Sequence, residues 1–486
     1  MAKPAKSELL RLSGCLSLGG VLTGAVCLGV LPPVAGLLAL GVIVFGLFSA
    51  MGERVHEVVL VLAAVFAGTT VLMNPAPRVS PLADLPDWFF DDGAYDESLP
   101  VVLHLVFDEL MSPGAIDGGL EGGEAVRRAL YEMGERFGLR TYDSVYSRTF
   151  FTNDALINLV NAEWSGSTAL SSRLPATQSV LENAYFDDME RRGYRTIVFQ
   201  SSLIDFCVNR SVDLCRRFPS YDPGVVKQTD RGLSVRAGQL AVTLLRAYEP
   251  SYLSRYGQRL FRIEEPSELD RDLGTQGRFD VHGFPSWFDT FTGFVTQVRR
   301  GTHVFAHFVV PHGPYLLTAD CSLGENKGTG YYLARRYSGP DAREKARREH
   351  YANYFAQLSC VRSRIERFLE GIAGIERFHD ALVVIHGDHG SRISAGKFVD
   401  DLATEDYVAN YGTYFAVRGP GVTPGVDCEF ASLPEVFRKH VGGPSLPPLD
   451  RSRPPLVVET RSGGSPVEAE MPLFGCASRQ EPEQGE

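Results

Sequence analysis

The N-terminal part of the sequence contains a long uncharged stretch, because residues 12–52 include no Lys, Arg, Asp or Glu. An apolar helix needs roughly 20 residues to cross a bilayer, since each residue adds about 1.5 Å to its length. The stretch therefore has room for helices over 12–31 and 34–51, separated by a Pro-Pro pair that cannot continue a helix. A further apolar run covers 55–73. We predict a membrane segment over residues 1–74 with three transmembrane helices.

Basic residues flank these predicted helices unevenly. Lys3, Lys6 and Arg11 precede the first helix, and Arg54 separates the second from the third. Because basic residues are retained on the cytoplasmic side, three crossings place the rest of the chain outside the cytoplasm. If the short third run lay along the membrane surface instead, the large domain would face the other side. We therefore predict a multi-pass protein of the inner (cytoplasmic) membrane with an extracytoplasmic catalytic domain.

The charge balance argues against a nucleic-acid partner. The chain holds 48 Lys and Arg against 59 Asp and Glu, for a net charge of -11. Basic residues outnumber acidic ones up to Arg78, so the remaining chain is more acidic than the whole. An acidic domain lacks the basic surface that attracts phosphate backbones. The expected partners are the cytoplasmic membrane and a phospholipid or glycan substrate.

Cysteine usage fits an oxidising compartment. The cysteines that follow the membrane segment are Cys207, Cys215, Cys321, Cys360, Cys428 and Cys476. Six is an even number, as a disulfide framework requires, although six unrelated buried thiols would give the same count. Cys207 and Cys215 flank a short polar loop and are predicted to pair. The sequence leaves the other pairings open.

Short apolar runs alternate with amphipathic helical stretches after residue 100. The predicted strands cover 101–107, 195–199, 302–310, 381–386 and 413–417, and the predicted helices cover 123–137, 180–192 and 345–372. Continuous apolar strands separated by helices are typical of a mostly parallel sheet that is covered on both faces. The sequence therefore predicts an α/β fold.

The domain boundaries follow from composition. Residues 75–99 are rich in Pro and Asp and are predicted to form a linker. Residues 100–444 form a single predicted catalytic domain, in which 219–288 lacks clear strands and is expected to be a helical cap. Residues 445–486 are rich in Pro, Gly and Glu and are expected to form an irregular C-terminal tail that Cys476 could anchor.

Acidic residues and a histidine follow two of the predicted strands. Asp108 and Glu109 come after the first, and Asp388 and His389 come after the strand over 381–386. Ligands of open α/β sheets bind beyond the carboxyl ends of strands, so these side chains are candidate ligands for one divalent metal ion. Mixed oxygen and nitrogen ligands favour zinc or manganese, while magnesium and calcium remain alternatives. Each pair alone would also fit a helix cap or a turn.

Thr152 is the candidate nucleophile. It precedes Leu156, Leu159 and Val160, whose spacing indicates a helix that begins near Thr152. Backbone N–H groups at such a terminus favour an anionic group, although an ordinary N-cap would look the same. A threonine hydroxyl attacks poorly unless a base or a metal ion activates it, and the predicted metal would do so.

Five elements occur in an order that resembles a known family. They are Asp108, Thr152, the Pro-His-Gly-Pro segment within 310–315, the Asp-His-Gly motif at 388–390, and the strand and turn over 414–421. Together they span residues 100–421 and resemble the sulfatase-like branch of the alkaline phosphatase superfamily. That resemblance implies a parallel sheet sandwiched between helices.

The resemblance also implies roles for individual residues. One metal ion would be held by Asp108, Thr152, Asp388 and His389. His312 would contact the phosphoryl or sulfuryl oxygens of the substrate. Glu109 matches a position that is a further metal carboxylate in many sulfatases.

One motif departs from the sulfatases. Sulfatases carry Cys-x-Pro-x-Arg, whereas this chain has Thr152-Asn-Asp-Ala-Leu156. A threonine behind membrane helices is similar to phosphoethanolamine transferases and lipoteichoic acid synthases, although those proteins usually have five helices. We therefore predict a membrane-anchored, metal-dependent phosphotransferase or hydrolase that acts on phosphate esters of envelope lipids or glycans. The alternatives are a sulfate-ester or phosphonate hydrolase of the same fold, and a non-catalytic envelope protein that binds a glycan or a partner.

Overall fold

The computed structural model of the protein describes residues 96–161, 180–200, 204–217, 268–324, 339–393, 402–442, 456–460 and 466–479. The predicted membrane segment, almost all of the predicted linker and residues 219–267 of the predicted cap lie outside these ranges. Within them, no helix is long and apolar enough to span a bilayer.

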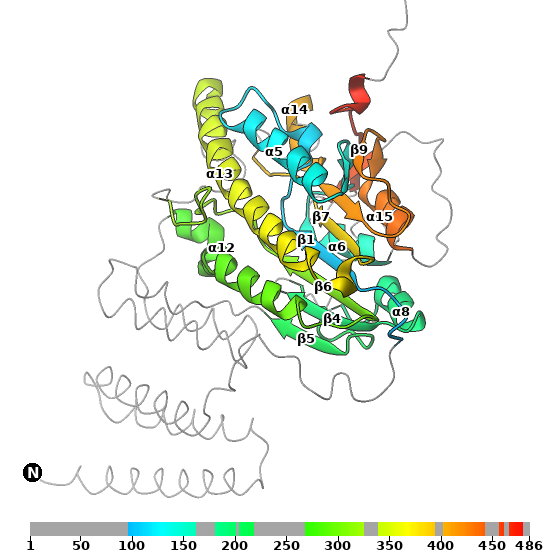
Figure 1. Cartoon of the computed structure of the whole chain (residues 1–486). Coiled ribbons are helices and arrows are strands. Elements are labelled where there is room, and N and C mark those ends of the chain that lie inside the picture. The colour runs from blue at the N-terminus through cyan, green and yellow to red at the C-terminus, as the bar shows by residue number, and fades with distance from the viewer. Residues whose placement is uncertain are drawn as a thin grey trace, which may run out of the picture. The chain divides into compact units, whose positions relative to one another are not determined.

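An eight-stranded sheet forms the centre of the fold (Figure 1), with strand order β5-β4-β6-β1-β7-β8-β2-β9. Its strands are β1 (Val102–Phe107), β2 (Arg140–Tyr142), β4 (Arg195–Gln200), β5 (Leu214–Arg217), β6 (Thr302–Phe308), β7 (Leu382–Gly387), β8 (Phe415–Arg418) and β9 (Gly425–Asp427). Only β8 runs antiparallel to its neighbours β7 and β2. The prediction of a mostly parallel sheet is confirmed.

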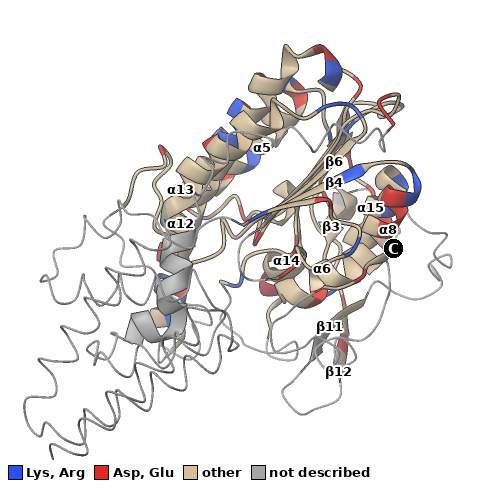
Figure 2. Cartoon of the chain, turned by 90° about the horizontal axis from the view of Figure 1, so that it is seen from below, with Lys and Arg blue, Asp and Glu red and all other residues tan. Residues whose placement is uncertain are grey.

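Helices cover both faces of the sheet, as the edge-on view in Figure 2 shows. One face packs against α5 (Gly123–Arg136), α12 (Glu268–Val295) and α13 (Pro340–Ala373), and the other against α6 (Thr152–Asn161), α8 (Ala184–Arg191) and α15 (Leu433–Val441). The smaller elements are β3 (Val145–Tyr146), β10 (Ala431–Ser432), α14 (Thr404–Tyr411) and the 3-10 turns Pro113–Ala115, Glu376–Phe378 and Ala477–Arg479.

The burial of β1 explains why its sequence is apolar throughout. Leu103 and Leu105 belong to the core under α5, α12 and α13, whereas Val102 and Val106 belong to the core under α6, α8 and α15. Because successive side chains of a strand point to opposite faces, a strand covered on both sides has no position for an exposed polar residue. Such a strand places its first polar residues at its end, where the candidate site begins.

Three disulfides cross-link the described part of the chain. Cys207 pairs with Cys215, as predicted, and Cys321–Cys360 and Cys428–Cys476 are the pairings that the sequence left open. Cys321–Cys360 joins the loop after β6 to α13. Cys428–Cys476 joins the C-terminal segment to the loop after β9.

Two elements differ from the sequence prediction. The C-terminal region, expected to be irregular, contains the antiparallel strands β11 (Leu456–Thr460) and β12 (Pro466–Glu470). A distant segment holds β11 in place, since Val457 and Val458 are buried and the Val458 N–H donates to the Arg148 carbonyl at 2.7 Å. The helix expected over 180–192 begins only at Ala184, because the Asn183 side chain caps it by accepting a hydrogen bond from the Phe186 N–H.

Candidate active site

The candidate metal ligands meet at the carboxyl ends of two neighbouring strands. Phe107 of β1 lies opposite Gly387 of β7, so the residues that follow each strand lie side by side. Asp108, Asp388 and His389 are fully buried there, and their ligand atoms lie within 4.8 Å of one another. The structure thus brings these three predicted residues together.

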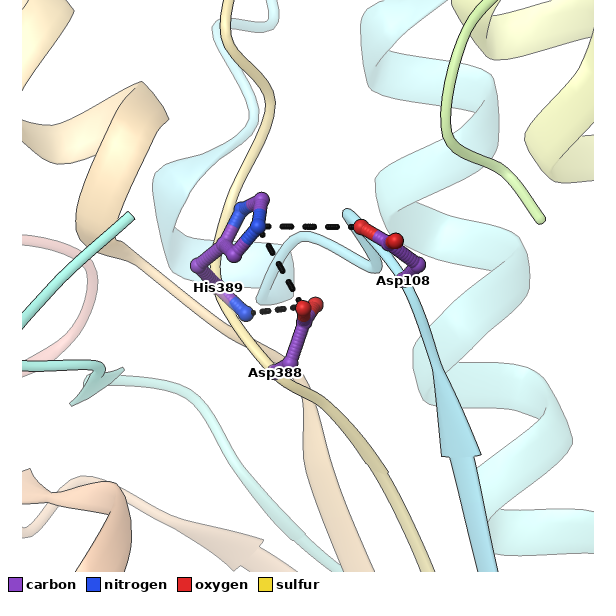
Figure 3. A group of neighbouring side chains, drawn as sticks. All are labelled: Asp108, Asp388 and His389. Carbon is purple, nitrogen blue, oxygen red and sulfur yellow. Dashed lines mark hydrogen bonds and ion pairs between the residues drawn. The ribbon is translucent and has the colours of Figure 1, made fainter. Parts of the chain in front are cut away.

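Figure 3 shows the arrangement of this group. The His389 Nε2 atom lies 3.3 Å from Asp388 Oδ2 and 3.6 Å from Asp108 Oδ1. Asp388 Oδ1 accepts hydrogen bonds from the backbone N–H groups of His389 at 2.8 Å and Glu109 at 3.0 Å. These backbone contacts fix the Asp388 carboxylate so that Oδ2 faces the ring of His389.

Thr152 joins the group from the other side. It is the first residue of α6, and its Oγ1 atom lies 3.3 Å from Asp108 Oδ2 and 3.2 Å from His389 Nε2. The side chain is buried. The hydroxyl at the start of α6 therefore contacts the Asp108 carboxylate, which follows β1, and the His389 imidazole, which follows β7. These residues are far apart in the sequence.

The tautomer of His389 follows from its backbone contact. Its Nδ1 atom lies 2.7 Å from the Gly390 carbonyl oxygen, which can only accept, so Nδ1 carries the hydrogen. Burial lowers the pKa of His389 to about 3, so the ring is neutral at neutral pH. The Nε2 atom therefore presents a lone pair to Thr152 and to the two carboxylates.

These atoms fit a divalent cation. Asp108 Oδ1 and Asp388 Oδ2 are buried without a hydrogen-bond partner among the described residues. Burial raises the pKa of both carboxyl groups, and the charge of Asp388 raises that of Asp108 further. Two anionic oxygens and a nitrogen lone pair repel one another at these distances, and a bound cation removes the repulsion. The donor set therefore supports the predicted metal site.

Glu109 lies beside this group but has other partners. Its Oε1 atom accepts a hydrogen bond from Arg392 Nε at 2.7 Å, and its Oε2 atom accepts one from the Tyr315 hydroxyl at 3.0 Å. Its backbone has a φ of +64°, a left-handed conformation that is uncommon for residues other than glycine. The Tyr354 hydroxyl donates to the Glu109 carbonyl at 2.6 Å. Glu109 is thus held tightly at the edge of the site.

His312 reaches the site from the loop after β6. Its backbone N–H donates to the Asp108 carbonyl at 3.0 Å, and its Nδ1 atom lies 2.6 Å from the Gly313 carbonyl oxygen. Burial, with the Arg392 charge, lowers the pKa of His312 well below its usual value. The neutral ring therefore carries its hydrogen on Nδ1 and a lone pair on Nε2. His312 groups with Asp108 and Glu109 within 4.8 Å.

Sequence reasoning missed three residues around this site. They are Tyr315, Tyr354 and Arg392. Arg392 follows the Asp-His-Gly motif closely, so its position in the chain was an available signal. Tyr354 lies within the long helix α13, where nothing in the local pattern marks it. His307 is fully buried on β6, and neither ring nitrogen has a hydrogen-bond partner within the described part of the chain.

No protein-family model matches the sequence, and no curated protein matches it either. A phosphonate monoester hydrolase of Agrobacterium radiobacter has a similar structure, with 12% identity, 71% of this chain and 74% of that chain covered, and a TM-score of 0.41. An alkaline phosphatase superfamily protein from Vibrio parahaemolyticus has 13% identity, coverage of 75% and 73%, and a TM-score of 0.39.

A zinc complex of the C-terminal periplasmic domain of EcEptC from Escherichia coli is also similar. It has 10% identity, coverage of 71% of this chain and 82% of that chain, and a TM-score of 0.40. These proteins are of the kind that the sequence motifs resembled.

Proposed function

We propose that the protein is a metal-dependent transferase or hydrolase of phosphate esters that uses Thr152 as its nucleophile. The observation that carries this proposal is the position of Thr152 Oγ1 against Asp108 and His389. One oxygen of each neighbouring carboxylate, Asp108 Oδ1 and Asp388 Oδ2, is buried there without a donor among the described residues. A hydroxyl at a helix N-terminus, beside ligands for a cation, is the arrangement that nucleophilic catalysis on an anionic ester requires.

One divalent metal ion would be held by Asp108, Thr152, Asp388 and His389. When bound, it would lower the pKa of the threonine hydroxyl and offset the charge of the phosphoryl oxygens. Zinc or manganese suits the mixture of carboxylate, hydroxyl and imidazole donors. The chain itself contributes the fixed geometry, because backbone hydrogen bonds orient the Asp388 carboxylate and the His389 ring before any substrate arrives.

The reaction follows from the positions of the side chains. Thr152 Oγ1 forms a bond to phosphorus while the bond from phosphorus to the departing ester oxygen breaks, and that oxygen leaves with the proton of the hydroxyl. The group carried on Thr152 then passes to an alcohol or to water. The Nε2 lone pair of His312 is suited to accept a hydrogen bond from this incoming hydroxyl, whose proton returns to Thr152 Oγ1 as the bond from that oxygen to phosphorus breaks.

An extracytoplasmic location is supported by the disulfides. Three pairs form within the described residues, and disulfides persist mainly in oxidising compartments. Together with the predicted membrane segment, they support esters of envelope lipids or glycans as substrates. A membrane anchor would keep the site close to lipid donors.

The decisive experiment detects the covalent intermediate. The full-length protein is incubated with membrane lipids, and intact mass is measured for wild type, Thr152→Ala and the surface control Thr290→Ala. We expect an adduct on wild type and on the control, and no adduct and no turnover for Thr152→Ala. Bound metal should be retained in all three by elemental analysis, because Asp108, Asp388 and His389 remain as ligands in Thr152→Ala. Substantial residual activity of Thr152→Ala would exclude the nucleophile.

The same experiment separates phosphate from sulfate chemistry. An adduct of phosphoethanolamine, phosphoglycerol or phosphate would name the donor class. A sulfated Thr152, formed from aryl sulfates and not from phosphodiesters, would support the alternative of sulfate-ester hydrolysis. A protein without bound metal, whose function survives Asp388→Asn, would support the non-catalytic alternative.

A further inference from the structure

Glu109 and Arg392 form a buried ion pair at the edge of the metal site. The Arg392 Nε atom lies 2.7 Å from Glu109 Oε1, and the two side chains are 12% and 0% exposed. Glu109 Oε2 is engaged by Tyr315. Both carboxylate oxygens of Glu109 therefore have partners, in contrast to Asp108 Oδ1 and Asp388 Oδ2, which have none among the described residues.

The backbone of Glu109 is held as firmly as its side chain. Its N–H donates to Asp388 Oδ1 at 3.0 Å, and its carbonyl accepts from Tyr354 at 2.6 Å. A left-handed φ is uncommon in a residue other than glycine and persists where its surroundings fix it. The hydrogen bonds of its backbone and side chain thus hold the Glu109 carboxylate against Arg392.

A second group of side chains with possible ligand atoms lies beside the Glu109–Arg392 ion pair. Asp108, Glu109 and His312 each offer a ligand atom within 4.8 Å of the others, so they form a group that attracts positive charge. The Arg392 guanidinium already lies against that group.

The charges of the site balance with one metal ion. The carboxylates of Asp108, Glu109 and Asp388 carry three formal negative charges, which one divalent cation and one guanidinium offset. A second divalent cation would leave the site positively charged and would compete with Arg392 for Glu109. A guanidinium has five N–H donors in a planar fork, so it can bind a carboxylate and a phosphoryl oxygen at the same time.

We propose that Arg392 supplies the second positive charge of the site and binds an anionic oxygen of the substrate ester, and that Glu109 positions this guanidinium instead of ligating a metal ion. The inference rests on the proposed function, because it assigns a substrate contact within the same site. It assigns Glu109 a role different from the metal carboxylate that the sequence resemblance implied.

The test uses readouts that do not require turnover. Full-length wild type, Arg392→Gln, Arg392→Lys and Glu109→Gln are compared by elemental analysis of bound metal and by calorimetric titration with inorganic phosphate. We expect one metal ion per chain in every protein. Phosphate should bind at least about tenfold more weakly to Arg392→Gln and Glu109→Gln than to wild type, because charge-assisted hydrogen bonds are lost. The phosphate affinity of Arg392→Lys should be intermediate, because lysine keeps the charge but not the planar arrangement of donors.

The matched control is Arg300→Gln. Arg300 also forms an ion pair, with Asp380 at 2.7 Å, but it precedes β6 and lies away from the site. Its phosphate affinity should equal that of wild type. Because Arg392→Gln leaves Glu109 buried without its charge partner, the double variant Arg392→Gln/Glu109→Gln is included, and it should weaken phosphate binding by the same factor.

Three results would overturn the inference. They are two metal ions per wild-type chain with one lost in Glu109→Gln, a phosphate affinity of Arg392→Gln within about twofold of wild type, and an unchanged affinity in the double variant. The proposed function is judged separately, by the Thr152 adduct. A protein that forms the adduct but binds phosphate without Arg392 would retain the proposed function and lose this inference.

Discussion

Single backbone contacts decide what the two histidines of the site can do. The carbonyl of the next residue binds Nδ1 in both His389 and His312, so each neutral ring presents a lone pair at Nε2. A lone pair suits metal ligation at His389. At His312 it favours accepting a hydrogen bond from a hydroxyl, whereas contact with an anionic phosphoryl oxygen requires a donor.

We therefore predict that His312 acts mainly in the second half of the reaction. His312→Gln should slow release of the group from Thr152 by about a hundredfold, because the hydrogen bond that orients the incoming hydroxyl is lost or displaced. The covalent adduct should accumulate in an intact-mass time course with membrane lipids. If the adduct instead forms more slowly and does not accumulate, His312 assists the first step by contacting the phosphoryl group.

A substitution at Gly390 would test how closely the loop that carries His389 is packed. A Cβ atom at this position would lie 2.1 Å from the Ala409 carbonyl oxygen and 2.8 Å from that of Gly412, and neither backbone atom can move easily. Gly390→Ala should displace His389 and weaken metal affinity by about tenfold or more without removing a ligand. The metal affinity is measured by titration in competition with a metal indicator. Gly374→Ala, where a Cβ meets nothing within 4 Å, is the control, and equal affinities in both variants would contradict the prediction.

At the scale of elements, β6 contributes a buried histidine to the packing of its neighbours. His303 lies between the hydroxyls of Tyr185 on α8, at 2.9 Å, and Thr196 on β4, at 3.2 Å. Burial lowers the pKa of His303 to about 3. The residue therefore links α8, β4 and β6 while its ring is neutral, and this linkage makes their packing sensitive to acid.

The pH dependence has a defined sign. In the unfolded chain, a histidine takes up a proton near its ordinary pKa of about 6.5, whereas folded His303 does not until about pH 3. Its contribution to stability is therefore complete above pH 6.5 and is lost as the pH falls toward 3. The slope is about 1.4 kcal/mol per pH unit for one proton.

We predict that His303→Gln has a shallower acid dependence than wild type. Guanidinium unfolding of the full-length protein in detergent at pH 7, 6 and 5 gives the free energy of unfolding. The variant is expected to be less stable at pH 7, but the difference from wild type should shrink by about 1 kcal/mol per unit toward pH 5. Parallel pH profiles for the two proteins would show that His303 does not titrate in this way.

At the scale of the whole molecule, the disulfides close loops of very different length. Cys207 and Cys215 are separated by 8 residues, whereas Cys428 and Cys476 are separated by 48. In the chain-entropy description, the longer loop stabilises the fold by about 1.5 kcal/mol more than the shorter one. Replacing Cys428 and Cys476 by serine should therefore lower the unfolding midpoint more than the same change at the shorter loop. A larger loss from the shorter loop would indicate that local packing dominates.

The sequence predicted those features that depend on local pattern. Apolar runs located the main strands, and the first polar residues after them identified Asp108 and Asp388, because the ends of neighbouring parallel strands must meet. Contacts between distant segments were not encoded locally. The Arg392 contact with Glu109 and the Tyr354 contact with the Glu109 carbonyl join residues far apart in the chain. The pairing of the last four cysteines depended in the same way on the completed fold.

The Cys321–Cys360 disulfide affects how the protein should be produced. It fastens the segment after His312 to α13, the helix that also supplies Tyr354, while the predicted metal ligands come from β1, β7 and α6. Expression in a reducing cytosol would leave those ligands on intact elements but release the loop that carries His312. A preparation could then bind metal fully and still turn over poorly, so metal content alone is an inadequate measure of its quality.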